Sequence, residues 1–140
     1  MPNYGEAQYW DERYKEQEGT VFDWLKNWAD IKETIEQNAI KVDKSEMKIL
    51  NIGCGNSPLC EEMYDCGYKH IYNMDISSVC IQQMGDRNKD RPEMKWETMD
   101  VRDLKYPDET FDLVIDKSTI DSLLCGDFEG INVGIMLKEC

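Results

Sequence analysis

A glycine loop and an aspartate, each directly after a predicted strand, most constrain the fold of this chain. Residues 47–52 form a short apolar run typical of a buried strand, and Gly53–Pro58 follow as a turn into a helix. A second strand over 70–74 ends at Asp75, 20 residues after Gly55. At this spacing a β-α-β unit places a carboxylate beside the ribose of a bound nucleotide. The sequence therefore predicts a nucleotide-type cofactor.

The remaining pattern predicts an α/β fold with one parallel sheet. Two further strands are expected over residues 94–99 and 111–115, and helices follow the strands. Strands that alternate with helices form parallel sheets with right-handed crossovers, so we predict strand order 3-2-1-4 with helices on both faces. Four residues would lie at the carboxyl ends of the strands, where an open sheet binds its ligand: Gly53, Asp75, Asp100 and Asp116.

A single domain is predicted over residues 1–140, with a helical segment over 1–45 and an α/β core over 46–140. Aromatic residues recur at helical spacing within 6–17, and a second helix is expected over 27–40. A chain of this length buries about two thirds of its unfolded surface, which is enough for one core.

The charge balance argues against nucleic acid as a partner. The formal net charge is −13 at pH 7, and no basic stripe occurs along the chain. Such a surface repels phosphate backbones. It suits a basic protein partner, and it suits equally well a solvated surface that keeps the protein soluble.

Neither a membrane segment nor a metal site is expected. No run of 18 apolar residues occurs, and residues 1–6 lack the basic and apolar regions of a signal peptide. The six cysteines form no Cys-x-x-Cys pair, and His70 is the single histidine. Free thiols in a reducing, cytoplasmic environment fit this pattern better than disulfides do.

The glycine loop separates the nucleotide cofactors. NAD and FAD sites usually have a third glycine where this chain has Pro58, and a P-loop needs a Gly-Lys-Ser/Thr sequence that is missing here. A cofactor without a pyrophosphate needs only close backbone approach at Gly53 and Gly55. S-adenosylmethionine is such a cofactor. Asp75 would accept hydrogen bonds from both ribose hydroxyls, and Asp100 would bind the adenine amino group. The alternative is that both acids cap helices.

These motifs resemble a known family. Residues 49–57, 96–101 and 111–117 are similar to class I S-adenosylmethionine-dependent methyltransferases. The segments Tyr9-Trp10-Asp11-Glu12-Arg13-Tyr14 and Phe22-Asp23-Trp24, with the glycine loop, resemble the branch that includes lysine methyltransferases of translation elongation factor 1-alpha. The resemblance implies a Rossmann-like methyltransferase fold and a protein-lysine methyltransferase that converts S-adenosylmethionine to S-adenosylhomocysteine. It also implies that the N-terminal helix forms a lid over the cofactor.

The resemblance and the glycine loop together nominate ten cofactor-binding residues. Aromatic faces among them would attract the sulfonium cation and exclude water. Val101 would pack on the adenine ring, and Asn51 is expected to hydrogen-bond the methionine end of the cofactor. The nominated residues are Trp10, Tyr14, Trp24, Gly53, Gly55, Asp75, Ile76, Asp100, Val101 and Lys117. No catalytic residue is assigned, because Asp116 and Asp121 serve equally well as a helix cap and a surface acid.

Two alternatives and one interaction remain open. The family fold has seven strands, whereas four are predicted here. The fourth strand, with Phe111, Leu113, Val114 and Ile115, would form an apolar edge that invites self-association. A non-catalytic cofactor-binding or interaction module is therefore one alternative to a protein-lysine methyltransferase. A small-molecule methyltransferase is the other.

Overall fold

The protein forms one four-stranded parallel sheet. The computed structural model describes residues 2–23, 25–38, 42–125 and 129–140. The strands are β1 (Lys48–Ile52), β2 (His70–Asp75), β3 (Lys95–Thr98) and β4 (Leu113–Asp116). Their order is β3-β2-β1-β4, and every neighbouring pair is parallel. The predicted strand order 3-2-1-4 is thereby confirmed.

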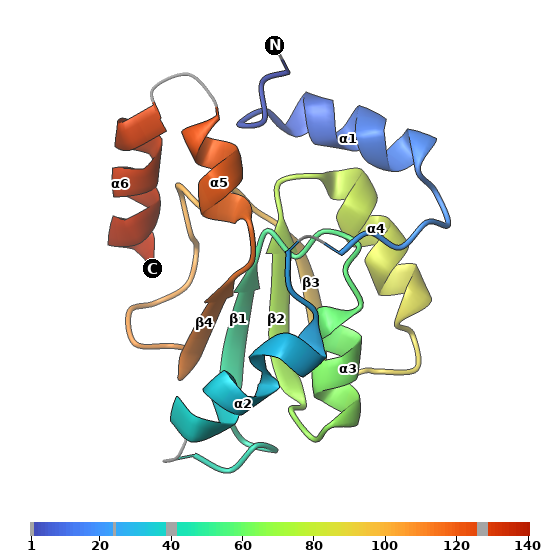
Figure 1. The fold of residues 1–140 in the computed structure, drawn as a ribbon, viewed down its shortest axis with the longest axis vertical. Helices are drawn as coiled ribbons and strands as arrows, with labels where there is room; N and C mark the ends of the chain where they lie inside the picture. The colour runs from blue at the N-terminus through green and yellow to red at the C-terminus, as the bar shows by residue number, and fades with distance from the viewer. Residues whose placement is uncertain (1, 24, 39–41, 126–128) are drawn as a thin grey trace.

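Helices follow β1, β2 and β4 as the sequence indicates, and others precede β1 (Figure 1). They are α1 (Ala7–Glu16), α2 (Trp28–Asn38), α3 (Leu59–Asp65), α4 (Ser78–Arg87), α5 (Thr119–Leu124) and α6 (Glu129–Glu139). Figure 1 shows α1 lying across the carboxyl ends of the strands, where the arrowheads point. This is the edge at which parallel α/β sheets bind ligands. Within the described ranges, no helix combines the length and the apolar character that crossing a bilayer requires.

Alternating side chains of β1 build two cores, one on each face of the sheet. Ile49 packs with buried residues of α2, α3 and α4 on one face. Leu50 and Ile52 pack on the other face with Leu123 of α5 and Met136 of α6. Successive residues of a strand point to opposite faces, so a strand covered on both sides buries nearly all of its side chains and is mostly apolar. The prediction of helices on both faces is confirmed.

Short polar contacts set the ends of the helices that flank β2. Ser77 caps α4, since its Oγ accepts a hydrogen bond from Cys80 N. Gly67, with φ +108°, follows the end of α3 in the left-handed region that closes many helices. Helix α3 begins at Leu59, whose backbone N donates to Ser57 Oγ at 3.2 Å.

The strand β4 begins two residues later than predicted. Asp112 Oδ2 accepts a hydrogen bond from Lys48 N at 2.8 Å, and Asp112 N donates to Lys48 O, which closes the start of β1. Phe111 therefore lies outside the strand. Its ring packs edge-on against Tyr72 and Tyr106 instead. The expectation that Phe111 belongs to an apolar strand edge is wrong.

Candidate functional site

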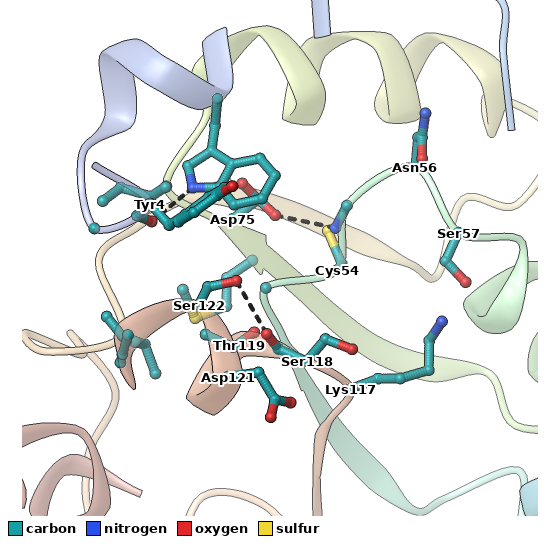
Figure 2. A pocket seen from close by; sticks show the side chains of 18 of the residues that line it. Tyr4, Cys54, Asn56, Ser57, Asp75, Lys117, Ser118, Thr119, Asp121 and Ser122 are labelled. Carbon is teal, nitrogen blue, oxygen red and sulfur yellow. Dashed lines mark hydrogen bonds between the residues drawn. The ribbon is translucent and has the colours of Figure 1, made fainter. Parts of the chain in front are cut away.

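A cavity of about 470 Å³ lies at the carboxyl ends of the strands. Its walls come from α1, the segment before α2, the glycine loop and the turns that follow β2, β3 and β4. Figure 2 shows Asp75 on one side and Lys117, Ser118 and Asp121 on the other. Among the nominated residues, those that line the cavity are Trp10, Tyr14, Gly53, Gly55, Asp75, Ile76, Asp100, Val101 and Lys117. Trp24 lies outside the described residues, and cofactor binding by the others stays a prediction.

Both glycines of the loop have backbone conformations that disfavour other residues. Gly53 has φ +56°, and a Cβ atom there would lie 1.8 Å from Thr119 Oγ1. Gly55 has φ +53°, and its Cβ would lie 3.0 Å from the Tyr14 hydroxyl. Because only glycine adopts such conformations without strain, the loop brings bare backbone to the cavity floor.

Asp75 is a buried carboxylate fixed by two backbone N–H groups. Oδ2 accepts a hydrogen bond from Gly55 N at 3.0 Å, and Oδ1 accepts one from Ser77 N at 3.0 Å. Burial raises the pKa of Asp75 above its usual value, and these two hydrogen bonds oppose that rise. Each carboxylate oxygen has a second lone pair for a ligand hydroxyl. Since Ser77 caps α4, helix capping does not explain Asp75.

Asp100 is held by an arginine that the sequence reasoning did not single out. Arg102 Nη2 donates to Asp100 Oδ2 at 2.7 Å, and Arg102 Nε donates to Oδ1 at 2.9 Å. Burial alone would raise the pKa of Asp100, but the Arg102 hydrogen bonds outweigh it and lower the pKa. Arg102 Nη2 also donates to Gly5 O at 3.0 Å, which joins the chain before α1 to this corner of the cavity.

Two aromatic residues of α1, Trp10 and Tyr14, form part of the cavity wall. The rings of Trp10 and Tyr14 stack with centroids 6.1 Å apart, and Trp10 Nε1 donates to Tyr4 O at 2.8 Å. Burial, reinforced by the Asp75 charge, raises the pKa of Tyr14 far above its ordinary value, so its hydroxyl stays neutral. The helix is anchored by Asp11, whose Oδ1 accepts hydrogen bonds from Ser77 Oγ and Val79 N.

A latch joins the segment before α2 to the glycine loop. Asn56 Nδ2 donates to Thr20 O at 2.9 Å, and Phe22 N donates to Asn56 Oδ1 at 3.1 Å. Ser57 Oγ donates to Asp23 Oδ1 at 2.8 Å. Asn56 was not singled out from the sequence, although this latch explains why the N-terminal motif and the glycine loop occur together.

Two further polar residues differ in their relation to the cavity. Lys117 lines it and forms an ion pair with Asp23, so it is not simply a solvated lysine. Asn51 is buried and does not line the cavity. Its Nδ2 donates to Asn73 Oδ1 at 3.0 Å, so the expectation that Asn51 bonds the methionine end of a cofactor is wrong.

The turn between β4 and α5 is held in a strained conformation. Ser118 has φ +82°, which is uncommon for a non-glycine residue, and its buried Oγ has no hydrogen-bond partner in the described part of the chain. Asp116 Oδ1 accepts from Thr119 N at 2.9 Å and Oδ2 accepts from Ile120 N at 3.2 Å, so Asp116 caps α5. Asp121 is exposed at the cavity wall.

The cavity is chemically suited to S-adenosylmethionine. Asp75 offers lone pairs for a ribose diol, and the glycine loop offers close backbone approach. The stacked rings of Trp10 and Tyr14 offer faces that attract a sulfonium. An adenine amino group would bind Asp100, which has to share its oxygens with Arg102.

Comparison with known proteins gives a consistent picture. Residues 49–128 match the family model described as "Methyltransferase domain". The chain is 41% identical over 127 residues to the eEF1A lysine and N-terminal methyltransferase of Mus musculus, which covers 90% of this chain and 18% of that protein. It is 36% identical over 131 residues to EEF1A lysine methyltransferase 4 of Mus musculus, which covers 93% of this chain and 50% of that protein. The chain thus spans half or less of these relatives.

A solved structure shares the arrangement of strands and helices. The PH0226 protein from Pyrococcus horikoshii OT3 is 26% identical, with a TM-score of 0.63. The match covers 91% of this chain and 58% of that one. The fold described above therefore occurs as part of a larger chain in a known structure.

Proposed function

The chain belongs to the class I S-adenosylmethionine-dependent methyltransferase family, and from this premise we propose that it is a protein-lysine N-methyltransferase acting on translation elongation factor 1-alpha. The family and the fold imply S-adenosylmethionine as the methyl donor. The observation that carries the proposal is Asp75, a buried carboxylate held at the cavity floor by Gly55 N and Ser77 N. The substrate is proposed from the names of the two relatives.

The strand order supports a division of the cofactor site into subsites. Asp75 would bind the ribose at the end of β2, and Asp100 with Val101 would bind the adenine beyond β3. Gly53 and Gly55 would lie against the methionine part, and Ile76 would add an apolar contact. A carboxylate at Asp75 accepts two hydroxyl hydrogens, which an amide does less well.

Methyl transfer depends more on aligning the attacking amine with the methyl group than on general acid–base catalysis. The bound cofactor supplies a methyl group already activated by the positive sulfur. Trp10 and Tyr14 would exclude water from it, and the Asp23–Lys117 ion pair would hold the segment before α2 against the β4–α5 turn. Such positioning supplies most of the acceleration when an amine attacks a methyl group. The amine must arrive neutral, and the polar groups of the cavity wall include Asp121 and the Ser118 hydroxyl.

The acidic surface supports a basic protein as substrate. The formal net charge of −13 would accelerate encounter with a positively charged partner and would do so less at high salt. Within this proposal the enzyme acts in the cytoplasm, where it would meet its substrate, translation elongation factor 1-alpha.

Isothermal titration with S-adenosylmethionine tests the cofactor half of the proposal. In Asp75→Ala, loss of charge-assisted hydrogen bonds should weaken binding about 100-fold or more. Asp75→Asn keeps the side-chain size and should weaken binding less. Asp86→Ala, an exposed acid on α4, serves as the control and should leave binding unchanged. Full binding by Asp75→Ala would refute the assignment, provided that thermal unfolding shows that the variant is folded.

Labelled methyl transfer tests the catalytic half. Incubation with purified elongation factor 1-alpha and with a cell lysate should place label on a lysine of the elongation factor. The first alternative is a cofactor-binding or interaction module, and its supporting observation is that β4 pairs with β1 alone among the described strands. It predicts cofactor binding without labelled product. Label in small molecules alone would instead indicate a small-molecule methyltransferase.

A further inference from the structure

Arg13 lines the cavity and lies within cation–π distance of two aromatic rings. Its guanidinium carbon lies 5.5 Å from the centroid of the Trp10 ring and 5.6 Å from that of the Phe22 ring. Nη1 also donates to the Tyr9 hydroxyl at 3.2 Å. These two cation–π contacts and the Tyr9 hydrogen bond restrict the positions that the guanidinium group can take. Arg13 is therefore a partly buried cation held by three contacts at the wall of the cavity.

The strand order sets the direction in which an extended cofactor would lie. With adenine at Asp100 and ribose at Asp75, the ligand runs from the β3 end across the β2 end. Its remaining part must continue in the same direction, because β1 and its glycine loop come next in the sheet. That remaining part of S-adenosylmethionine is the methionine moiety, which ends in an ammonium and a carboxylate.

Helix α1 runs across the cavity in the same direction. Gly5, just before α1, accepts a hydrogen bond from Arg102 in the turn after β3. Near the other end of α1, the Tyr14 hydroxyl reaches the glycine loop, close enough that a Cβ at Gly55 would lie 3.0 Å from it. Arg13 directly precedes Tyr14. It therefore lies toward the glycine-loop end, where the methionine moiety is expected.

The latch of the N-terminal segment keeps the second ring in place. Phe22 N donates to Asn56 Oδ1 at 3.1 Å, so the Phe22 ring is tied to the loop that follows β1. The side chain of Arg13 thus contacts Trp10 of its own helix and Phe22 of a segment attached to the glycine loop.

We propose that Arg13 binds the carboxylate of the methionine moiety of S-adenosylmethionine. A guanidinium group presents a planar fork of N–H donors that matches a carboxylate in two parallel hydrogen bonds. The flanking rings of Trp10 and Phe22 hold this fork before the ligand arrives, which reduces the entropy lost on binding. The inference rests on the proposed function, because it takes S-adenosylmethionine as the ligand. It adds a residue that the sequence reasoning did not place in the cofactor site.

The other two cations of the described cavity wall have different surroundings. Arg102 holds the Asp100 carboxylate with Nε and Nη2, and Lys117 pairs with Asp23. Arg102 also lies at the opposite end of the cavity, in the turn after β3. Position along the cavity therefore excludes Arg102, and the two neighbouring aromatic rings and the planar fork of donors distinguish Arg13 from Lys117.

The test compares two ligands that differ only in the carboxylate, S-adenosylmethionine and decarboxylated S-adenosylmethionine. Arg13→Met removes the charge but keeps an unbranched side chain that can pack against the two rings. By isothermal titration, this substitution should weaken binding of S-adenosylmethionine about 10- to 100-fold and change binding of the decarboxylated ligand less than about twofold. Arg13→Lys should give an intermediate loss for S-adenosylmethionine, since it keeps the charge without the fork.

Lys15→Met is the matched control, since it removes one exposed positive charge from the same helix outside the cavity. It should leave both affinities unchanged. Equal affinity of the wild-type protein and Arg13→Met for S-adenosylmethionine would overturn the inference alone. Equal weakening of both ligands would also overturn it, because Arg13 would then act through packing. Failure of the wild-type protein to bind either ligand would overturn the proposed function, and the inference with it.

Discussion

At the scale of single residues, the site depends on two glycines that bring the backbone of the loop after β1 to the Asp75 carboxylate. Asp75 joins the glycine loop to the start of α4 through Gly55 N and Ser77 N. The loop reaches Asp75 because Gly53 and Gly55 both adopt positive φ angles. Gly53 also leaves room for α5, since Thr119 packs directly against it and donates from Oγ1 to Ile52 O. One glycine thus sets both the cavity floor and the position of α5.

Replacing Gly53 by alanine should destabilise the fold severely. The new Cβ would lie 1.8 Å from Thr119 Oγ1, in addition to the strain of φ +56°. Gly67→Ala is the matched control, because Gly67 also has a positive φ but nothing lies within 4 Å of its added Cβ. We expect a loss of about 1–2 kcal/mol for Gly67→Ala from backbone strain, and about 1–3 kcal/mol more for Gly53→Ala from overpacking. Urea unfolding measures both, and equal losses would contradict the close contact.

At the scale of secondary-structure elements, the sequence predicted the strands whose bounds are marked by neighbouring residues, and it missed features that depend on contacts between distant residues. The strands β1 and β2 lie within a residue of their predicted bounds, because apolar runs and a glycine loop mark them in the sequence. β4 was misjudged because Asp112 closes β1 through Lys48, which is 64 positions away. The Asn56 latch and the Arg102–Asp100 pair also escaped sequence reasoning. In the sequence alone, nothing distinguishes these residues from ordinary exposed polar residues.

The docking of α1 supplies a prediction at this scale. Asp11 Oδ1 accepts hydrogen bonds from Ser77 Oγ at 2.5 Å and Val79 N at 3.3 Å, which attaches α1 to the start of α4. In Asp11→Ala, amide hydrogen exchange in α1 should become about tenfold faster, which corresponds to about 1.4 kcal/mol. Exchange in β1 should not change. Glu12→Ala is the control, because the described hydrogen bond of Glu12 stays within α1. Similar acceleration in both variants would show that Asp11 is not the anchor.

At the scale of the whole molecule, the strands of the sheet differ in how far neighbouring strands and helices cover them. β1 and β2 are covered on both faces and paired on both sides, whereas β4 pairs with β1 alone among the described strands. Val114 is 37% exposed on β4, and Ile131, Ile135 and Leu137 are exposed on the neighbouring α6. An unpaired edge beside apolar surface is a template for pairing with another chain. The acidic surface works against association of two copies through charge repulsion.

These opposing effects predict self-association that increases with salt. Added salt shortens the screening length from about 30 Å at 0.01 M to about 3 Å at 1 M, so repulsion between two acidic copies fades while edge pairing remains. Sedimentation velocity should therefore show a larger dimer fraction at high salt. Val114→Lys puts a charge on the strand edge and should abolish the dimer. Val21→Lys makes the same substitution at another exposed valine, away from the sheet, and should not. A monomer at every salt concentration, or equal effects of the two lysines, would show that β4 does not mediate association.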